Sequence, residues 1–366
     1  SAEAAIGTLV DQAAAKTVAD MIDALTNDST AEEVVAASNA YDKLTEAQKA
    51  YITEAQLAAL NAQVKRVEEA VVQAKADAFK AKVEALGTPT FPKDKDAVEA
   101  LATEYEALEE IVQAKLTETK ATLDGYVEKA SKYVQLEVAF GSDRIVSKFS
   151  GYDTYYLVIY NPKDTAVSFY YAGEASSWAA CGKTTLPSKS YTQIVYDSRF
   201  AAAGNAYMYS DGGATINFND TESGWICKVY GRKTEAGAEV VALSVNGTTD
   251  DPTYGKVLST NVTNGFFEAW GYMKKTQLAE LAKFDNVYFY IYNPSEVDVA
   301  FFFQDDGNWS AFDRTILKAG TWTKVSLSAV FGIPEGAKGV YVDVEKGTEG
   351  ITLDGWMISD FYGTAK

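Results

Sequence analysis

The chain has 366 residues, of which 47% are hydrophobic and 13% aromatic, and its formal net charge is −18. The apolar side chains suffice for several cores, so the composition predicts two to four globular domains and excludes wholesale disorder. The acidic excess argues against nucleic acid and anionic membranes as partners, because both are held chiefly by Lys and Arg.

Histidine is absent. Its absence removes the usual general base, the commonest metal ligand and every nucleophile that depends on a histidine base. The sequence also has no P-loop, dinucleotide fingerprint or nucleophile elbow. No apolar run approaches the ~20 residues of a membrane-spanning helix. We therefore expect a protein that is not an enzyme, with no catalytic residues and no insertion into a membrane.

The region 1–132 is predicted to be a helical bundle, because Ala, Glu, Lys, Gln and Leu dominate it and apolar residues recur at steps of three and four. Thr30 and Glu33 form a capping box that predicts the start of a helix. A long helix is expected from about Thr53 until Gly87-Thr-Pro89, because proline cannot continue a helix.

A weak repeat lies inside this helical region. Met21-Ile-Asp-Ala-Leu25 recurs in part as Lys82-Val-Glu-Ala-Leu86, which predicts two three-helix units at 1–75 and 76–132. The segment Ala40-Tyr-Asp-Lys-Leu-Thr-Glu-Ala-Gln-Lys-Ala-Tyr-Ile52 resembles a helix-turn-helix phrase of small helical repeats in Gram-positive extracellular modular proteins. The resemblance implies that these helices serve as a spacer or scaffold.

The remaining two-thirds of the chain is duplicated. Tyr156-Leu-Val-Ile-Tyr-Asn-Pro162 returns as Tyr288-Phe-Tyr-Ile-Tyr-Asn-Pro294, and Trp178 and Trp225 return 131 residues later as tryptophans. Runs of Val, Ile, Phe, Tyr and Thr between Gly, Asn and Asp predict β-strands. We expect two tandem antiparallel β-sandwiches at 133–244 and 253–366, joined by a linker at 245–252, with a helix at 273–283.

Two cysteines occur, Cys181 and Cys227, and the repeat aligns them with Phe312 and Ile358. Large apolar residues at the sister positions indicate interior sites. The sequence therefore favours a buried thiol pair or a single disulfide over a reactive or metal-binding site, and does not choose between the first two.

The second sandwich resembles the jelly-roll, galactose-binding-like carbohydrate-binding modules of secreted polysaccharide-active proteins. Three segments carry the resemblance: the strand that ends at Pro294, Leu317-Lys-Ala-Gly-Thr-Trp-Thr-Lys-Val-Ser-Leu327 and Leu353-Asp-Gly-Trp-Met-Ile-Ser-Asp-Phe361. The first sandwich keeps them more loosely. The resemblance implies an extracellular or cell-surface protein of Gram-positive, gut-type bacteria of the starch-adherence kind.

Sugar recognition needs flat aromatic faces and polar side chains that replace water at the hydroxyl groups. Two tryptophans lie in polar stretches just after an aromatic strand, and an aromatic pair near residue 270 has no counterpart in the first sandwich. For each of these rings, packing in the core is the alternative. The candidate ligand-binding residues are Trp309, Asp305, Asp306, Asn308, Trp178, Glu174, Trp270 and Tyr272.

Other tryptophans are expected to be structural. Trp322 and its counterpart Tyr191 alternate with smaller residues and are assigned to the core, as are Trp225 and Trp356. The acidic loop that precedes Trp309 could supply oxygen ligands for a structural calcium ion, but a solvated acidic loop is the favoured interpretation. No cofactor is otherwise expected.

The sequence thus predicts a monomeric protein that binds polysaccharide without cleaving it, with α-glucan as the first candidate ligand. Two weak sites on one frame would act together on a repeating polymer. The alternative is a structural or adhesive protein whose sandwiches contact a partner protein, or which spaces other modules from the cell surface.

Overall fold

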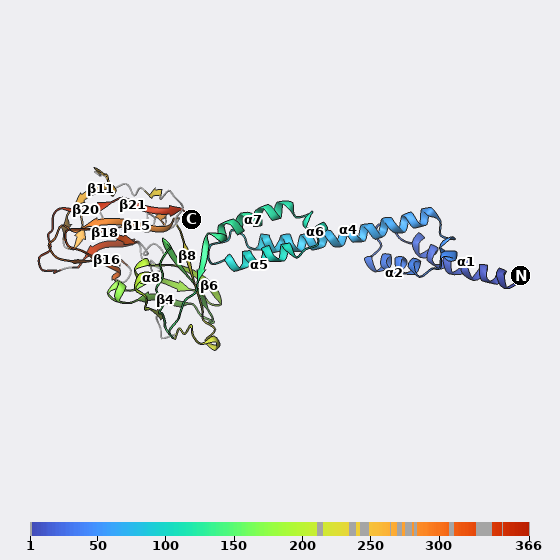
Figure 1. Cartoon of the computed structure of the whole chain (residues 1–366), viewed down its shortest axis with the longest axis horizontal. Helices are drawn as coiled ribbons and strands as arrows, with labels where there is room; N and C mark the ends of the chain where they lie inside the picture. Colours follow the sequence, from blue (N-terminus) through green and yellow to red (C-terminus); the bar gives the residue numbers. More distant parts are fainter. Residues whose placement is uncertain are drawn as a thin grey trace. The chain divides into compact units, whose positions relative to one another are not determined.

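A computed structural model describes residues 2–210, 215–233, 239–241, 249–263, 265–268, 273–274, 280–281, 284–306, 311–326, 339–345 and 347–365. The chain forms two compact units, one of Ser1–Pro89 with Ala97–Val127 and one of Thr90–Asp96 with Glu128–Lys366. The N-terminal region is helical and the C-terminal region is rich in β-strands, as predicted (Figure 1).

Seven helices form the N-terminal region within the described residues. Three of them begin at threonines that close a capping box, Thr30, Thr45 and Thr53, so the sequence directs these starts locally. The predicted long helix is present as α4. No helix in the described part of the chain is both long and apolar enough to cross a membrane. The helices are α1 (Ala2–Asp23), α2 (Ala31–Asp42), α3 (Glu46–Lys49), α4 (Glu54–Ala85), α5 (Lys95–Glu106), α6 (Glu110–Gln113) and α7 (Thr117–Ser131).

The weak helical repeat corresponds to repeated packing. Helix α4 contacts α1 and α2 through one part of its length and α6 through another. Three residues of α1 and the three residues 61 positions later in α4 are all buried. The pairs are Ala15 and Ala76, Val18 and Phe79, and Ile22 and Val83. One face of α1 and one face of α4 therefore play the same part in successive helical groups.

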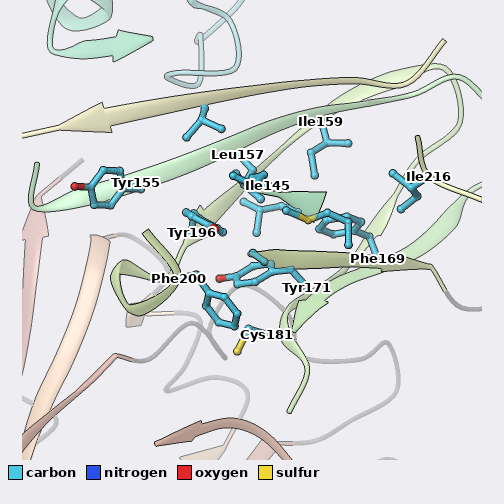
Figure 2. Close-up of a cluster of buried hydrophobic side chains, with 14 of the residues drawn as sticks. Ile145, Tyr155, Leu157, Ile159, Phe169, Tyr171, Cys181, Tyr196, Phe200 and Ile216 are labelled. Carbon is cyan, nitrogen blue, oxygen red and sulfur yellow. The ribbon is translucent and has the colours of Figure 1, made fainter. Parts of the chain in front are cut away.

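The first lobe, residues 133–232, consists of two antiparallel four-stranded sheets. The β3 sheet has the order β1-β8-β3-β6 and the β4 sheet has the order β2-β7-β4-β5. A core cluster of side chains from both sheets lies between them, including Leu157, Phe169, Tyr171 and Tyr196 (Figure 2). The elements are β1 (Tyr133–Leu136), β2 (Arg144–Ile145), β3 (Thr154–Asn161), β4 (Val167–Ala172), η1 (Glu174–Ser176), β5 (Cys181–Leu186), β6 (Ser190–Tyr196), α8 (Ser198–Ala203), β7 (Ala206–Ser210), η2 (Thr221–Ser223) and β8 (Ile226–Arg232).

The second lobe, from residue 239 onward, repeats this plan. The β15 sheet has the order β10-β11-β20-β15-β21-β9 with β18 also on β15, and the β16 sheet has the order β12-β13-β19-β16-β17 with β14 also on β19. Residues of both sheets share one core cluster. The strands are β9 (Glu239–Val241), β10 (Thr249–Asp251), β11 (Gly255–Thr260), β12 (Val262–Thr263), β13 (Phe266–Phe267), β14 (Met273–Lys274), β15 (Phe284–Tyr292), β16 (Val299–Asp305), β17 (Ala311–Leu317), β18 (Trp322–Ser326), β19 (Gly339–Val344), β20 (Trp356–Ser359) and β21 (Phe361–Ala365).

Strand register shows the duplication residue by residue. Tyr160 pairs with Tyr191 in the first lobe, and Tyr292 pairs with Trp322 in the second. A register shift between Phe169 and Tyr171 recurs 132 residues later between Phe301 and Phe303. The residue on the facing strand at each shift has positive φ, Gly182 at 59° and Asp313 at 53°. The second copy therefore keeps this bulge even without glycine.

Four features differ from the predicted organisation. Residues 249–251 of the predicted linker form strand β10, which pairs with β11 in the second lobe. Strand β9, which lies inside the sequence boundary of the first sandwich, pairs with β21 in the second lobe. Residues 90–96 belong to the compact β unit and not to the helical one. Within the predicted helix 273–283, Met273–Lys274 are β14 and residues 280–281 are helical, and the others lie outside the described residues.

Candidate functional site

The outer face of the β4 sheet carries a row of aromatic side chains. Along β4 and β7, Phe169, Tyr171 and Met208 are buried, whereas Tyr170, Tyr207 and Tyr209 are only half-buried. Because successive side chains of a strand point to opposite faces, the half-buried tyrosines lie on the side away from the core. Three phenol rings therefore reach solvent on one sheet surface.

The tyrosine rings are fixed by one another and by Arg144. Tyr170 pairs with Tyr209 across the strands, and the ring centroids lie 5.1 Å apart at an interplanar angle of 19°. Arg144 pairs with Tyr207, holds its guanidinium carbon 4.9 Å from the ring centroid and donates a hydrogen bond to the hydroxyl. Burial, with smaller effects of Tyr170 and Asp143, raises the pKa of Tyr209. Its hydroxyl therefore stays a neutral donor and acceptor at physiological pH.

Trp178 stands beside this row in the loop that follows β4. Its indole is 56% exposed, the largest such fraction among the exposed aromatic residues of the described chain. Its ring centroid lies 5.7 Å from that of Tyr207, at 45°. The indole therefore packs on one side against Tyr207 of the sheet, while much of it faces water.

The loop holds Trp178 outward through its own hydrogen bonds. The hydroxyl of the fully buried Ser176 donates its one proton to the carbonyl of Ala179 at 2.7 Å and lies 3.2 Å from the carbonyl of Gly173, and the amide of Trp178 donates to Gly173 at 2.9 Å. Ser177 and Trp178 both have positive φ, 49° and 65°, a conformation unfavourable for residues other than glycine. The exposure of the indole is thus imposed by the loop and is not an accident of a free side chain.

We call Trp178, Tyr207, Tyr209, Tyr170 and Arg144 the Trp178 surface. Exposed carboxylates lie at its margin, Glu174 in the same loop and Asp143 beside Arg144. The surface offers an aromatic face for the C–H groups of a sugar ring, with phenol, guanidinium and carboxylate groups for its hydroxyls. It could bind a sugar chain by stacking and hydrogen bonding.

Some of the predicted site residues are exposed and others are buried. Trp178 and Glu174 are exposed together in one loop. Asp305 is 1% exposed at the end of β16, so it does not reach the surface of the second lobe. The half-buried Asp306 accepts a hydrogen bond from the amide of Gly339 at 3.2 Å. Four predicted residues lie outside the described residues: Asn308, Trp309, Trp270 and Tyr272.

Sequence reasoning missed Arg144 and the three tyrosines of the Trp178 surface. A signal was present in Ala206-Tyr-Met-Tyr-Ser210, where aromatic residues alternate with apolar ones at the spacing of a strand. The other tryptophan predictions had mixed outcomes. Trp225 and Trp356 are in the core, as expected, at 4% and 0% exposure. Tyr191 is 43% exposed, and Trp322 is half-buried on the face of its strand opposite to the buried Val325, so the assignment of these two rings to the core is wrong.

Both cysteines are free thiols. Cys181 is buried in the core of the first lobe, where Figure 2 shows it below Phe200 and Tyr171. Burial raises the pKa of both thiols well above the ordinary value. Neither thiol is therefore suited to nucleophilic chemistry at physiological pH.

The described residues contain no group of three His, Cys, Asp or Glu side chains that could hold a metal ion. In the acidic loop that the sequence offered for calcium, Asp305 is 1% exposed and Asp306 is engaged with a main-chain amide.

No family model matches the sequence, and no curated protein is significantly similar to it. Among solved structures, the PBSX exported protein XepA is 8% identical, with a TM-score of 0.19 over 63% of this chain and 85% of that one. PNGase F, a glycosylasparaginase from Flavobacterium meningosepticum, is 10% identical, with a TM-score of 0.20 over 64% and 96%. The insecticidal delta-endotoxin Cry8Ea1 from Bacillus thuringiensis is 10% identical, with a TM-score of 0.16 over 98% and 77%. Likenesses at these TM-scores carry no argument about this chain.

Proposed function

We propose that the protein binds polysaccharide without cleaving it, and that the Trp178 surface is a binding site. The exposed indole of Trp178 carries the proposal. A tryptophan that is 56% exposed and held by a strained, hydrogen-bonded loop forgoes much of the hydrophobic stabilisation that burial would give. Such a feature is explained by a ligand that covers the indole.

The chemistry of the surface favours a neutral sugar polymer. Phenol hydroxyls and a guanidinium lie beside the indole, and carboxylates of opposite charge lie at the margin. A surface with both signs of charge has no strong preference for an ionic ligand, whereas aromatic faces attract the C–H groups of any pyranose. We propose an α-glucan as the first ligand, presented to an extracellular protein whose two lobes are jelly-roll, galactose-binding-like modules.

A pull-down on insoluble starch, cellulose and mucin tests the proposal. The wild-type protein should sediment with starch, and Trp178→Ala should raise the starch concentration needed for half-maximal sedimentation about fivefold or more, because removal of a central aromatic anchor commonly costs more than ~1 kcal/mol. Tyr191→Ala is the matched control, since Tyr191 is an exposed aromatic residue on the other sheet of the same lobe.

The results of the pull-down distinguish polysaccharide binding from the alternative function. An equal half-maximal starch concentration for the wild type and Trp178→Ala would remove the site assignment. A wild-type protein that binds none of the three polymers would leave the alternative, a structural or adhesive protein that contacts a partner protein.

A further inference from the structure

A second aromatic surface lies on the outer face of the β15 sheet, in the second lobe. Six half-buried rings occupy it, three of them at alternate positions of β15. We call this set the β15 aromatic face. Its members are Tyr254, Tyr288, Tyr290, Tyr292, Trp322 and Tyr362.

The six rings form one continuous cluster. Tyr254 stacks on Trp322 with centroids 4.3 Å apart and an interplanar angle of 24°, and its centroid lies 5.1 Å from that of Tyr290. Tyr288 stacks on Tyr362 at 5.4 Å and 19°. The chain of contacts closes through Tyr290, which meets both Tyr288 and Tyr362 edge to face. The face is therefore an ordered aromatic surface and not a set of isolated side chains.

Part of the equivalent face of the first lobe is covered by the protein itself, while Tyr160 and Tyr191 on the same face reach solvent. Phe91 stacks on Tyr133 at 6.2 Å, and Tyr133 meets the edge of Tyr156 at 5.5 Å. Asp96 binds the ammonium of Lys228 and accepts a hydrogen bond from Tyr230 at 3.4 Å. Under this cover Tyr156 and Tyr230 are 0% and 1% exposed.

The second lobe has tyrosines at the equivalent positions and an additional tyrosine beside them, and here all of these rings reach solvent. Tyr288 and Tyr362 pair as Tyr156 and Tyr230 do in the first lobe, but both are half-buried. Tyr290 replaces Val158, which is 2% exposed. An antiparallel sheet face that meets water is ordinarily polar. A contiguous aromatic surface in its place is typical of an interaction site.

The position of Tyr254 is set by local hydrogen bonds. A carboxylate oxygen of Asp251 accepts from the amides of Thr253 and Tyr254, both at 2.8 Å, and the hydroxyl of Tyr362 donates to the carbonyl of Tyr254. This turn places the phenol ring on Trp322. The aromatic pair is thus built before any ligand arrives, which lowers the entropy cost of binding.

The chemistry of the face favours a sugar chain over an aliphatic or strongly charged partner. Every ring except the indole carries a hydroxyl, and the exposed Lys324 holds its ammonium 3.8 Å from the centroid of Tyr288. Sugars present C–H groups to ring faces and hydroxyls to phenol and ammonium groups. We propose that the β15 aromatic face is a second binding site for a neutral glycan, of the same class that the Trp178 surface binds. This inference rests on the proposed function.

Titration calorimetry with a soluble α-glucan oligosaccharide such as maltoheptaose tests the inference. The wild-type protein should bind two molecules, Trp178→Ala and Trp322→Ala should each bind one, and the double variant should bind none. Trp322→Phe should keep a weaker second site, because a ring remains. Tyr191→Ala, which changes the residue equivalent to Trp322 in the first lobe, should leave both sites intact.

Two further measurements keep the test decisive. Tyr254→Ala removes a ring from a turn and not from the sheet, so it should abolish the second site even if Trp322→Ala fails to fold. A synthetic peptide of residues 88–98, which includes the segment that covers the first lobe, tests a peptide as the occupant.

The inference and the proposed function fail in different ways. A wild-type protein that binds one molecule, lost in Trp178→Ala and kept in both Trp322→Ala and Tyr254→Ala, overturns the inference alone. Binding of the peptide in a Trp322-dependent manner, without a second glucan site, also overturns it. A wild-type protein that binds no glycan overturns both proposals.

Discussion

Asn161 and Asn293 stand 132 residues apart and make equivalent hydrogen bonds. The amide nitrogen of Asn161 donates to the carbonyls of Thr165 and Leu186, both at 3.0 Å, and that of Asn293 donates to Val297 and Leu317 at 2.9 and 3.1 Å. Each side-chain oxygen accepts from the main-chain amide two residues later. Both asparagines are 0% exposed. Each asparagine therefore links the ends of neighbouring strands through hydrogen bonds, an arrangement that we call the clamp. It explains why the asparagine of Tyr-Asn-Pro is repeated.

Asn161→Ala and Asn293→Ala should each destabilise the protein by roughly 2 kcal/mol or more, because each leaves buried main-chain groups without a partner. Urea denaturation followed by tyrosine and tryptophan fluorescence measures the change. Lys163→Ala is the control, since that residue contributes only its main-chain amide and its side chain is exposed. A loss below ~0.5 kcal/mol in both asparagine variants would contradict the clamp.

Ser176→Ala should weaken glycan binding without touching the aromatic rings. The substitution removes the side-chain hydrogen bond of the loop that positions Trp178, at a cost of about 1 kcal/mol. We expect a lower melting temperature and a higher dissociation constant together. Ser177→Ala is the matched control because that side chain is exposed in the same loop. Unchanged affinity in a destabilised Ser176→Ala protein would show that the loop does not position the indole for binding.

Arg199→Met should be among the most damaging single substitutions in the β unit. Arg199 pairs with the carboxylate of Asp197, whose side chain is 1% exposed, and also donates to the carbonyl of Arg314 and the hydroxyl of Thr315 at 2.7 and 2.8 Å. Its removal leaves a buried charge unpaired, which costs roughly 3–5 kcal/mol. Adding Asp197→Asn should recover part of the loss in urea denaturation. No recovery in the double variant would mean that the contacts with residues 314 and 315 dominate.

Asp360→Asn should stabilise the protein at neutral pH. Burial raises the pKa of Asp360 against the opposing effect of Lys256, so the folded protein holds the proton more tightly than the unfolded chain does. The wild type therefore loses stability as the pH rises from the unfolded pKa, about 3.9, through the folded pKa. The gain in melting temperature from Asp360→Asn should be present at pH 7 and shrink toward pH 4. A gain independent of pH would contradict this assignment.

The duplicated part of the fold could be predicted because a repeat constrains the sequence at many positions at once. Ile159 and Ile291, or Trp225 and Trp356, are recognisable in the chain and prove to be equivalent core positions. The exposure of Trp178 could be predicted for a different reason. A tryptophan that is surrounded by polar residues in the sequence has few apolar neighbours with which it could form a core.

The remaining site residues depend on pairing between distant strands. Nothing in the local sequence of Tyr170 indicates that Tyr209 will lie opposite it, or that Arg144 will lie over Tyr207. The errors at Tyr191 and Trp322 have the same origin. Alternation along a strand shows which residues share a face, but it does not show which face meets the core.

The segment 90–96 lies between two parts of the helical unit in sequence and yet belongs to the β unit. No single cut can therefore divide this chain into a complete helical fragment and a complete β fragment. A recombinant fragment that begins at residue 128 would lack Phe91 and Asp96. Tyr156 and Tyr230 would then be exposed to solvent, and the fragment would be prone to aggregate. The two units are interleaved along the polypeptide, which crosses from one to the other three times, after residues 89, 96 and 127.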